Sequence, residues 1–167
     1  CTVIASDKTG TLTVNEQTAK KIVLPSGNVF DIEGRGYNDQ GKVISNENIS
    51  IELAKPIGLL GVLNNEAHLE KRKGAFESYG DSIDIAFLAL GKKLKVSASE
   101  YKIIETIPYE SENKYSAVFY EFEGKIHCTV KGSIEKVLEF SKTMIENEDT
   151  IPLDSKKLLR QNEKLAS

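Results

Sequence analysis

The octet Ser6-Asp7-Lys8-Thr9-Gly10-Thr11-Leu12-Thr13 follows directly on the short apolar run from Cys1 to Ala5. That run is rich in β-branched residues and predicts a buried strand. Asp7 stands where the strand ends, which is a common position for reactive groups in α/β sheets. An Asp there can attack phosphorus, and Lys8, the loop amides and the Thr hydroxyls can hold phosphate charge. The octet therefore predicts aspartyl-phosphate chemistry, and the alternative is a simple turn after a strand.

The composition limits the class of protein. A chain of 167 residues makes one ordinary domain, or one domain with a fragment of another. Its net charge of −3 gives no support for binding to nucleic acid or to an anionic membrane. The two cysteines, Cys1 and Cys128, do not form a disulfide framework, so we expect a reducing compartment. No apolar run approaches the roughly 18 residues that suggest a membrane span.

The first half of the chain alternates short strands, turns and helices. We expect strands at 20–24, 29–37 and 42–44, separated by turn residues. Apolar spacing predicts a helix over 51–63 that restarts at Pro56 and stops at Asn64 and Asn65. Asp81 is a good N-cap for a second helix, in which Asp84 occupies the position of the acid in a capping box.

The second half is mostly β. We expect a strand over 103–107 that ends at Pro108, and further strands over 115–122 and 126–131. In the last of these, Ile126, Cys128 and Val130 alternate with polar residues, so we expect them on the core face. Lys131 should then lie on the opposite face with Thr129. Gly132 frees the backbone, and Ser133 can cap a helix over 134–141.

The octet resembles the phosphorylation signature of the P-type cation-transporting ATPases. The resemblance implies that Asp7 accepts the γ-phosphate of ATP, with Lys8 and Thr9 as further catalytic residues, and that Asp7 and Thr9 hold Mg²⁺ in the intact pump. The family is related to the dehalogenase-like phosphatases, whose loop reads D-x-D-G-T and whose second Asp is the general acid and base. Thr9 stands at that position here, which should slow hydrolysis of the acyl phosphate.

Five further segments resemble parts of the same family, and one of them, N-N-E-A at residues 64–67, follows the predicted helix and is expected to have a structural role. The stretch F-D-I-E-G-R-G-Y-N-D-Q-G-K-V, which begins at Phe30, is similar to a segment typical of the calcium-type branch. The segment G-D-S-I-D implies that Asp84 lies near the adenine amino group, whereas the capping box is the structural alternative. The motif T-V-K-G-S-I-E implies that Lys131 and Gly132 line the nucleotide pocket; a solvated strand end is the alternative. The segment P-Y-E-S-E-N-K implies that Tyr109 stacks on adenine; the alternative is that Tyr109 is a core aromatic. The polar and basic positions of that segment fall on Ser111 and Lys114.

The resemblance implies an α+β fold, an antiparallel β-sheet flanked by helices, as in the nucleotide-binding domain of P-type ATPases. Residues 1–14 would be a fragment of the phosphorylation domain, and residues 15–167 the nucleotide-binding domain. The chain would be a soluble, excised, cytosol-facing piece of a multi-pass membrane pump. Its ligands would be ATP and Mg²⁺, and its partners the rest of the pump and the transported cation; nucleic acid is not expected. The isolated piece should be inactive, because it lacks the acids that complete the Mg²⁺ site.

Two other functions remain open at this point. One is a soluble phosphotransferase or phosphatase of the dehalogenase type, which Thr9 and the absence of a downstream acid pair disfavour. The other is a nucleotide-sensing module without catalysis, in which Asp7 would be inert. Phosphoenzyme formation in the full-length parent separates the sensing module from the pump.

Overall fold

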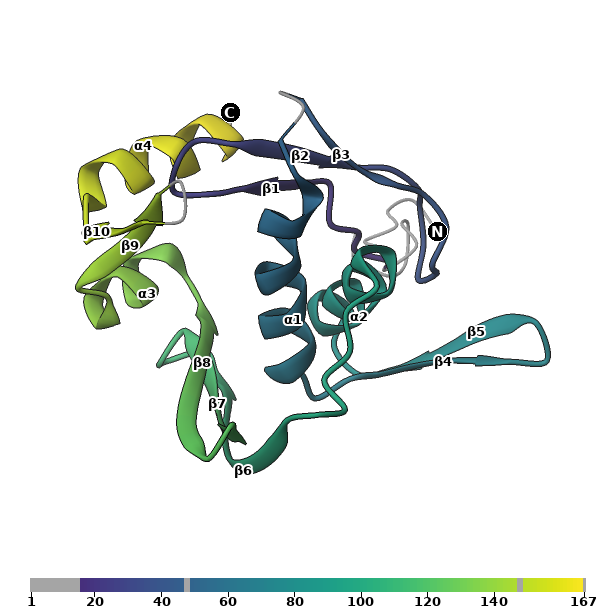
Figure 1. Cartoon of the computed structure of the whole chain (residues 1–167). Helices are drawn as coiled ribbons and strands as arrows, with labels where there is room; N and C mark the ends of the chain where they lie inside the picture. The colour runs from purple at the N-terminus through teal and green to yellow at the C-terminus, as the bar shows by residue number, and fades with distance from the viewer. Residues whose placement is uncertain (1–15, 47–48, 147–148, 167) are drawn as a thin grey trace, which may run out of the picture.

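The computed structural model describes residues 16–46, 49–146 and 149–166, and within them the fold is α+β with antiparallel strands, as predicted (Figure 1). The elements in chain order are β1 (Lys21–Val23), β2 (Val29–Ile32), β3 (Val43–Ser45), the 3-10 helix η1 (Ile51–Ala54), α1 (Lys55–Leu63), β4 (His68–Arg72), β5 (Ala75–Tyr79), α2 (Ser82–Leu94), β6 (Lys102–Glu110), β7 (Tyr115–Phe122), β8 (Lys125–Gly132), α3 (Ile134–Phe140), β9 (Thr143–Glu146), β10 (Asp149–Pro152) and α4 (Ser155–Ala166). No helix among these is long and apolar enough to cross a bilayer.

The main core lies between the β1–β2–β3 sheet and helix α2. The three strands are antiparallel in that order, and Phe30 at the centre of the sheet is completely buried. The apolar residues that pack together here are Ile22, Phe30, Ile32, Val43, Ala54, Leu90 and Leu94. Burial of these residues removes apolar surface from water and stabilises the packing of the β1–β2–β3 sheet on α2.

Helices α1 and α2 pack closely because glycines face the partner helix. A side chain at Gly61 would collide with the ring of Phe87, and one at Gly91 would collide with Val62. The absence of Cβ atoms therefore lets the two backbones approach, and Figure 1 shows the helices side by side. Pro56 stands in the first turn of α1, as predicted. The predicted N-cap of α2 is also confirmed, because the Asp81 side chain accepts a hydrogen bond from the Ile83 amide at 2.8 Å.

The β6–β7–β8 sheet forms the other half of the domain. Its tight turn is at Glu123 and Gly124, which have φ angles of 51° and 71°. Two successive positive φ values are typical of a type I′ hairpin turn. The predicted end of the first strand at Pro108 is wrong, because β6 continues to Glu110. Pro108 is tolerated because β6 is an edge strand, and its pairing with β7 shifts register between Ile107 and Glu110.

The predicted core face of β8 is also wrong. Ile126 is 72% exposed and Cys128 is exposed, whereas Thr129 is buried at 4% exposure. The inward face of β8 is set by its contact with the residue that follows α1. There the buried side-chain amide of Asn64 donates a hydrogen bond to the main-chain oxygen of Thr129. The alternation of residue types in the strand carries no information about that distant partner.

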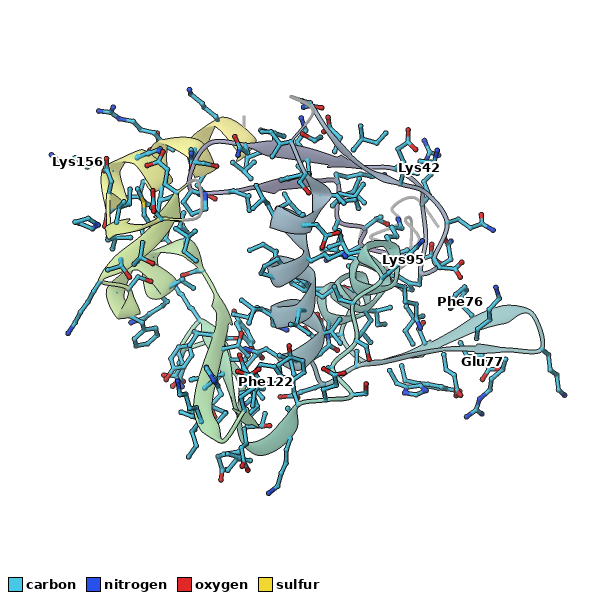
Figure 2. All side chains as sticks on the ribbon, in the orientation of Figure 1. Lys42, Phe76, Glu77, Lys95, Phe122 and Lys156 are labelled. Carbon is cyan, nitrogen blue, oxygen red and sulfur yellow. The ribbon has the colours of Figure 1, made fainter. Side chains whose placement is uncertain are left out.

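Two hairpins complete the fold. The β4–β5 hairpin projects from the body of the domain, and Figure 2 shows Phe76 and Glu77 on opposite sides of its ribbon. At its base Leu69 packs with Ile85 and Ala89 of α2. The β9–β10 hairpin leads into α4, whose first turn is held by the Asp154 side chain bonded to the Lys157 amide at 3.0 Å.

We predict that Phe30→Ala lowers the free energy of unfolding by about 3–5 kcal/mol, because it leaves a cavity at the centre of the main core. Ile126→Ala is the matched control, and since Ile126 is largely exposed we expect a change within about 0.5 kcal/mol. Urea denaturation followed by circular dichroism measures both. Equal losses in the two variants would contradict the assignment of the core.

Candidate nucleotide site

An ion pair between Lys131 and Asp84 lies where the β6–β7–β8 sheet meets α2. Lys131 is near the end of β8, and Asp84 is in the first turn of α2, 47 residues away in sequence. The side chains are 21% and 15% exposed, so the pair is mostly buried but still reaches solvent. The structure thus brings together two of the residues predicted to contact a nucleotide.

Lys131 has two further neighbours. Its Nζ donates a hydrogen bond to the main-chain oxygen of Asn64 at 2.8 Å. The same Nζ lies 5.4 Å from the centre of the Phe87 ring, within the range of a cation–π interaction. A flexible lysine side chain is therefore held in one place by a carboxylate, a carbonyl and an aromatic face.

Asp84 is held by the segment that follows α1. Its Oδ2 accepts a hydrogen bond from the Glu66 amide at 3.1 Å, and its main-chain oxygen accepts one from Asn65 Nδ2 at 2.8 Å. The predicted capping-box role of Asp84 is therefore wrong, because the carboxylate is bonded to Glu66 and Lys131 instead. Its position at the N-terminus of α2 still favours the negative charge.

Asn64 anchors this segment to the sheet. Its side chain is buried, and Nδ2 donates to the main-chain oxygens of Ser116 at 3.0 Å and Thr129 at 3.3 Å. The Ser116 hydroxyl in turn donates to Asn64 Oδ1 at 2.9 Å. Ser116 pairs with Lys131 across β7 and β8, so the amide is bonded directly beside the lysine. The sequence predicts a helix stop at the two asparagines, and the resemblance of residues 64–67 to a family segment implies a structural role. Neither prediction includes the contact between Asn64 and the sheet.

Three other predicted nucleotide residues, Tyr109, Ser111 and Lys114, lie on the edge strand β6 and in the turn that joins it to β7. Tyr109 is 58% exposed on the edge strand β6, and Ser111 is exposed in the turn that follows. Lys114 adopts a φ of 59° in the same turn, and its main-chain oxygen accepts a hydrogen bond from Ser133 at 3.0 Å. A nucleotide that reached both Tyr109 and Lys131 would have to span from the edge strand to the far strand of this sheet.

Gly132 has a structural reason to be glycine. A Cβ at this position would lie 2.5 Å from the oxygen of Lys114 and 2.7 Å from the Cβ of Tyr115. The backbone of Gly132 therefore lies close to the neighbouring strand β7. This contact explains why the residue is glycine, without a ligand that approaches it. A role for Gly132 in the pocket stays a prediction.

Glu135 follows in the first turn of α3. A hydrogen bond to its own main-chain amide, and a second to the Ser133 side chain, lower the pKa of its carboxyl. The charge suits the N-terminus of a helix, and the Ser133 side chain also accepts from the Lys136 amide at 3.4 Å. The predicted cap at Ser133 is confirmed.

The predicted phosphorylation loop, with Asp7, Lys8 and Thr9, lies outside the described residues, and so does the Mg²⁺ site expected at Asp7 and Thr9. Among residues 16–46, 49–146 and 149–166 there is no group of three or more His, Cys, Asp or Glu side chains that could hold a metal ion. The two charged groups of the Lys131–Asp84 pair can each contact a ligand. An ammonium can attract phosphate, and a carboxylate can accept from an amino group.

A family model described as "P-type ATPase, cytoplasmic domain N" matches residues 57–167. The chain is 33% identical over 157 residues to the cation-transporting ATPase pma1 of Synechocystis, which covers 86% of this chain and 17% of that protein. It is 33% identical over 148 residues to the calcium-transporting ATPase of Bacillus subtilis, and this match covers 83% of this chain and 16% of that protein. It is 31% identical over 159 residues to the human calcium-transporting ATPase type 2C member 2, and this match covers 88% of this chain and 16% of that protein. The chain thus spans about one sixth of the length of these relatives. It belongs to the P-type cation ATPase family, and its residues 57–167 match the cytoplasmic domain N of that family.

Proposed function

We propose that this chain binds ATP for a calcium-type cation pump and that, in the intact pump, it presents the γ-phosphate to Asp7. The single observation that carries the proposal is the Lys131–Asp84 ion pair. The resemblance assigns both residues to the nucleotide, and they meet although they are far apart in the chain. The names of the relatives support a cation pump, because three of them are called cation- or calcium-transporting ATPases.

Lys131 and Asp84 carry opposite charges, and each can contact a different group of the same ligand. Within the described residues, Asp84 and the Asn64 carbonyl use two of the three donors of the Lys131 ammonium. The third donor of the ammonium is then available to a phosphate oxygen. Asp84 can accept a hydrogen bond from the amino group of adenine, and the exposed ring of Tyr109 can stack on a base.

We expect the isolated chain to bind ATP weakly. One lysine and one stacking ring supply only a few favourable contacts, and a millimolar dissociation constant corresponds to about −4 kcal/mol. Ser111 and Lys114 would lie at the edge of such a complex, in the β6–β7 turn. The other contacts to the phosphates would come from the rest of the pump.

The chemical step would belong to the octet. Asp7 would be the nucleophile, and Lys8 and the Mg²⁺ held with Asp7 and Thr9 would offset phosphate charge. Thr9 replaces a general base, so the acyl phosphate would last long enough to drive transport. The partners would be the other domains of the pump, its membrane helices and the cation. The soluble phosphatase and the nucleotide sensor are the alternatives, and the transporter names of the relatives favour the pump over both.

We predict that Lys131→Ala weakens ATP binding to the 167-residue chain by about tenfold, because it removes the ammonium that faces the phosphates. Lys125→Ala is the matched control, since Lys125 is an exposed lysine at the other end of the same strand. Titration with ATP, followed by NMR chemical shifts, measures both affinities. The assignment of Lys131 would be refuted by equal affinities for the wild type and Lys131→Ala.

We predict that Asp7→Asn abolishes phosphoenzyme formation in the full-length pump but leaves nucleotide binding nearly unchanged. The amide keeps the shape of the carboxylate but is not a useful nucleophile. Acid-quenched incubation with radiolabelled ATP, with and without hydroxylamine, measures the acyl phosphate. If Asp7→Asn still carried a hydroxylamine-sensitive label, Asp7 would not be the acceptor.

A further inference from the structure

The connector between α1 and β4, residues 64–67, touches both members of the ion pair. The main-chain oxygen of Asn64 accepts from Lys131, and the main-chain amide of Glu66 donates to Asp84. Between them, Asn65 Nδ2 donates to the main-chain oxygens of Gly61 at 3.0 Å and Asp84 at 2.8 Å. A segment of four residues thus contacts a lysine from the sheet and a carboxylate from α2.

We infer that Asn64 is a positioning residue for nucleotide binding, which acts by fixing the connector and, through it, the ammonium of Lys131. The inference rests on the proposed function, because it takes Lys131 as the residue that meets ATP. Asn64 itself faces away from solvent, at 2% exposure, so its effect on a ligand is exerted through Lys131.

The three side-chain hydrogen bonds of Asn64 explain how the position is fixed. Its amide uses both a donor and an acceptor, because Nδ2 donates to Ser116 and Thr129 and Oδ1 accepts from Ser116. These bonds fix the end of α1 against β7 and β8. The carbonyl of the same residue is then presented to Lys131, which projects from the neighbouring position on β8.

An amide is the side chain that this site requires. Asp would lack the NH₂ group that donates to the two strand carbonyls, and Ala would leave both carbonyls and the Ser116 hydroxyl without this partner. A lysine side chain has many rotamers, so ordering it before the ligand arrives lowers the entropy cost of binding. Loss of Asn64 should therefore weaken ATP binding even though Lys131 is still present.

A double-mutant cycle tests the inference. ATP affinity is measured by NMR titration for the wild-type 167-residue chain, Asn64→Ala, Lys131→Ala and the double variant. We expect Asn64→Ala to weaken binding by about three- to tenfold, and to have no further effect in the Lys131→Ala background. Asn38→Ala is the control: it removes a similar pair of side-chain hydrogen bonds, to Arg35 and Gln40, in a loop away from the ion pair. We expect Asn38→Ala to leave ATP affinity unchanged.

Each result has a defined meaning. Unchanged affinity in folded Asn64→Ala, or an equal loss with and without Lys131, overturns the positioning role. Unchanged affinity in Lys131→Ala alone overturns the proposed nucleotide role of Lys131, and the inference with it. If Asn64→Ala does not fold, Ser116→Ala replaces it in the cycle, because it removes only the hydroxyl donated to Asn64. A loss of affinity in Ser116→Ala that disappears without Lys131 supports the inference, and no loss overturns it.

Discussion

The buried amide of Asn64 bonds to strands β7 and β8 of the β6–β7–β8 sheet, and the geometry of the candidate site depends on those bonds. They join the end of α1 to Ser116 on β7 and Thr129 on β8. A buried polar group is costly unless it is bonded, so a fully bonded amide stabilises this one arrangement over alternatives. This arrangement decides which face of β8 is buried, and Lys131, which lies on the same face as Thr129, points towards Asp84.

Close packing of α1 on α2 supplies the other half of the geometry. Gly61 leaves room for the ring of Phe87, which in turn lies near the ammonium of Lys131. The same approach brings the first turn of α2 beside the connector, so that Asp84 meets the amide of Glu66. The site is therefore built on two helices and a sheet, and rigid elements hold a ligand-binding pair more accurately than loops do.

Local signals were sufficient for much of the fold. The strands on either side of the 123–124 turn, the caps at Asp81 and Ser133, and the position of Pro56 in the first turn of α1 all follow from neighbouring residues. Neighbouring residues did not predict which face of β8 is buried or which group binds the Asp84 carboxylate. Both depend on a contact with the segment after α1. Residue alternation favoured Ile126 as a core residue, but a polar contact between distant segments outweighed it. The meeting of Lys131 with Asp84 was foreseeable only from the family resemblance, which assigned both to one ligand.

The most direct measurement is an NMR titration of the isotope-labelled 167-residue chain with ATP. The account predicts the largest shifts at the amides of Asn65, Glu66, Asp84 and Lys131, because the nucleotide would bind at the ion pair that the connector holds. Shifts confined to the basic helix α4, around Lys156 and Arg160, would contradict it. In that case ATP would be attracted only by surface charge, and the junction at Asn64 would have a purely structural role.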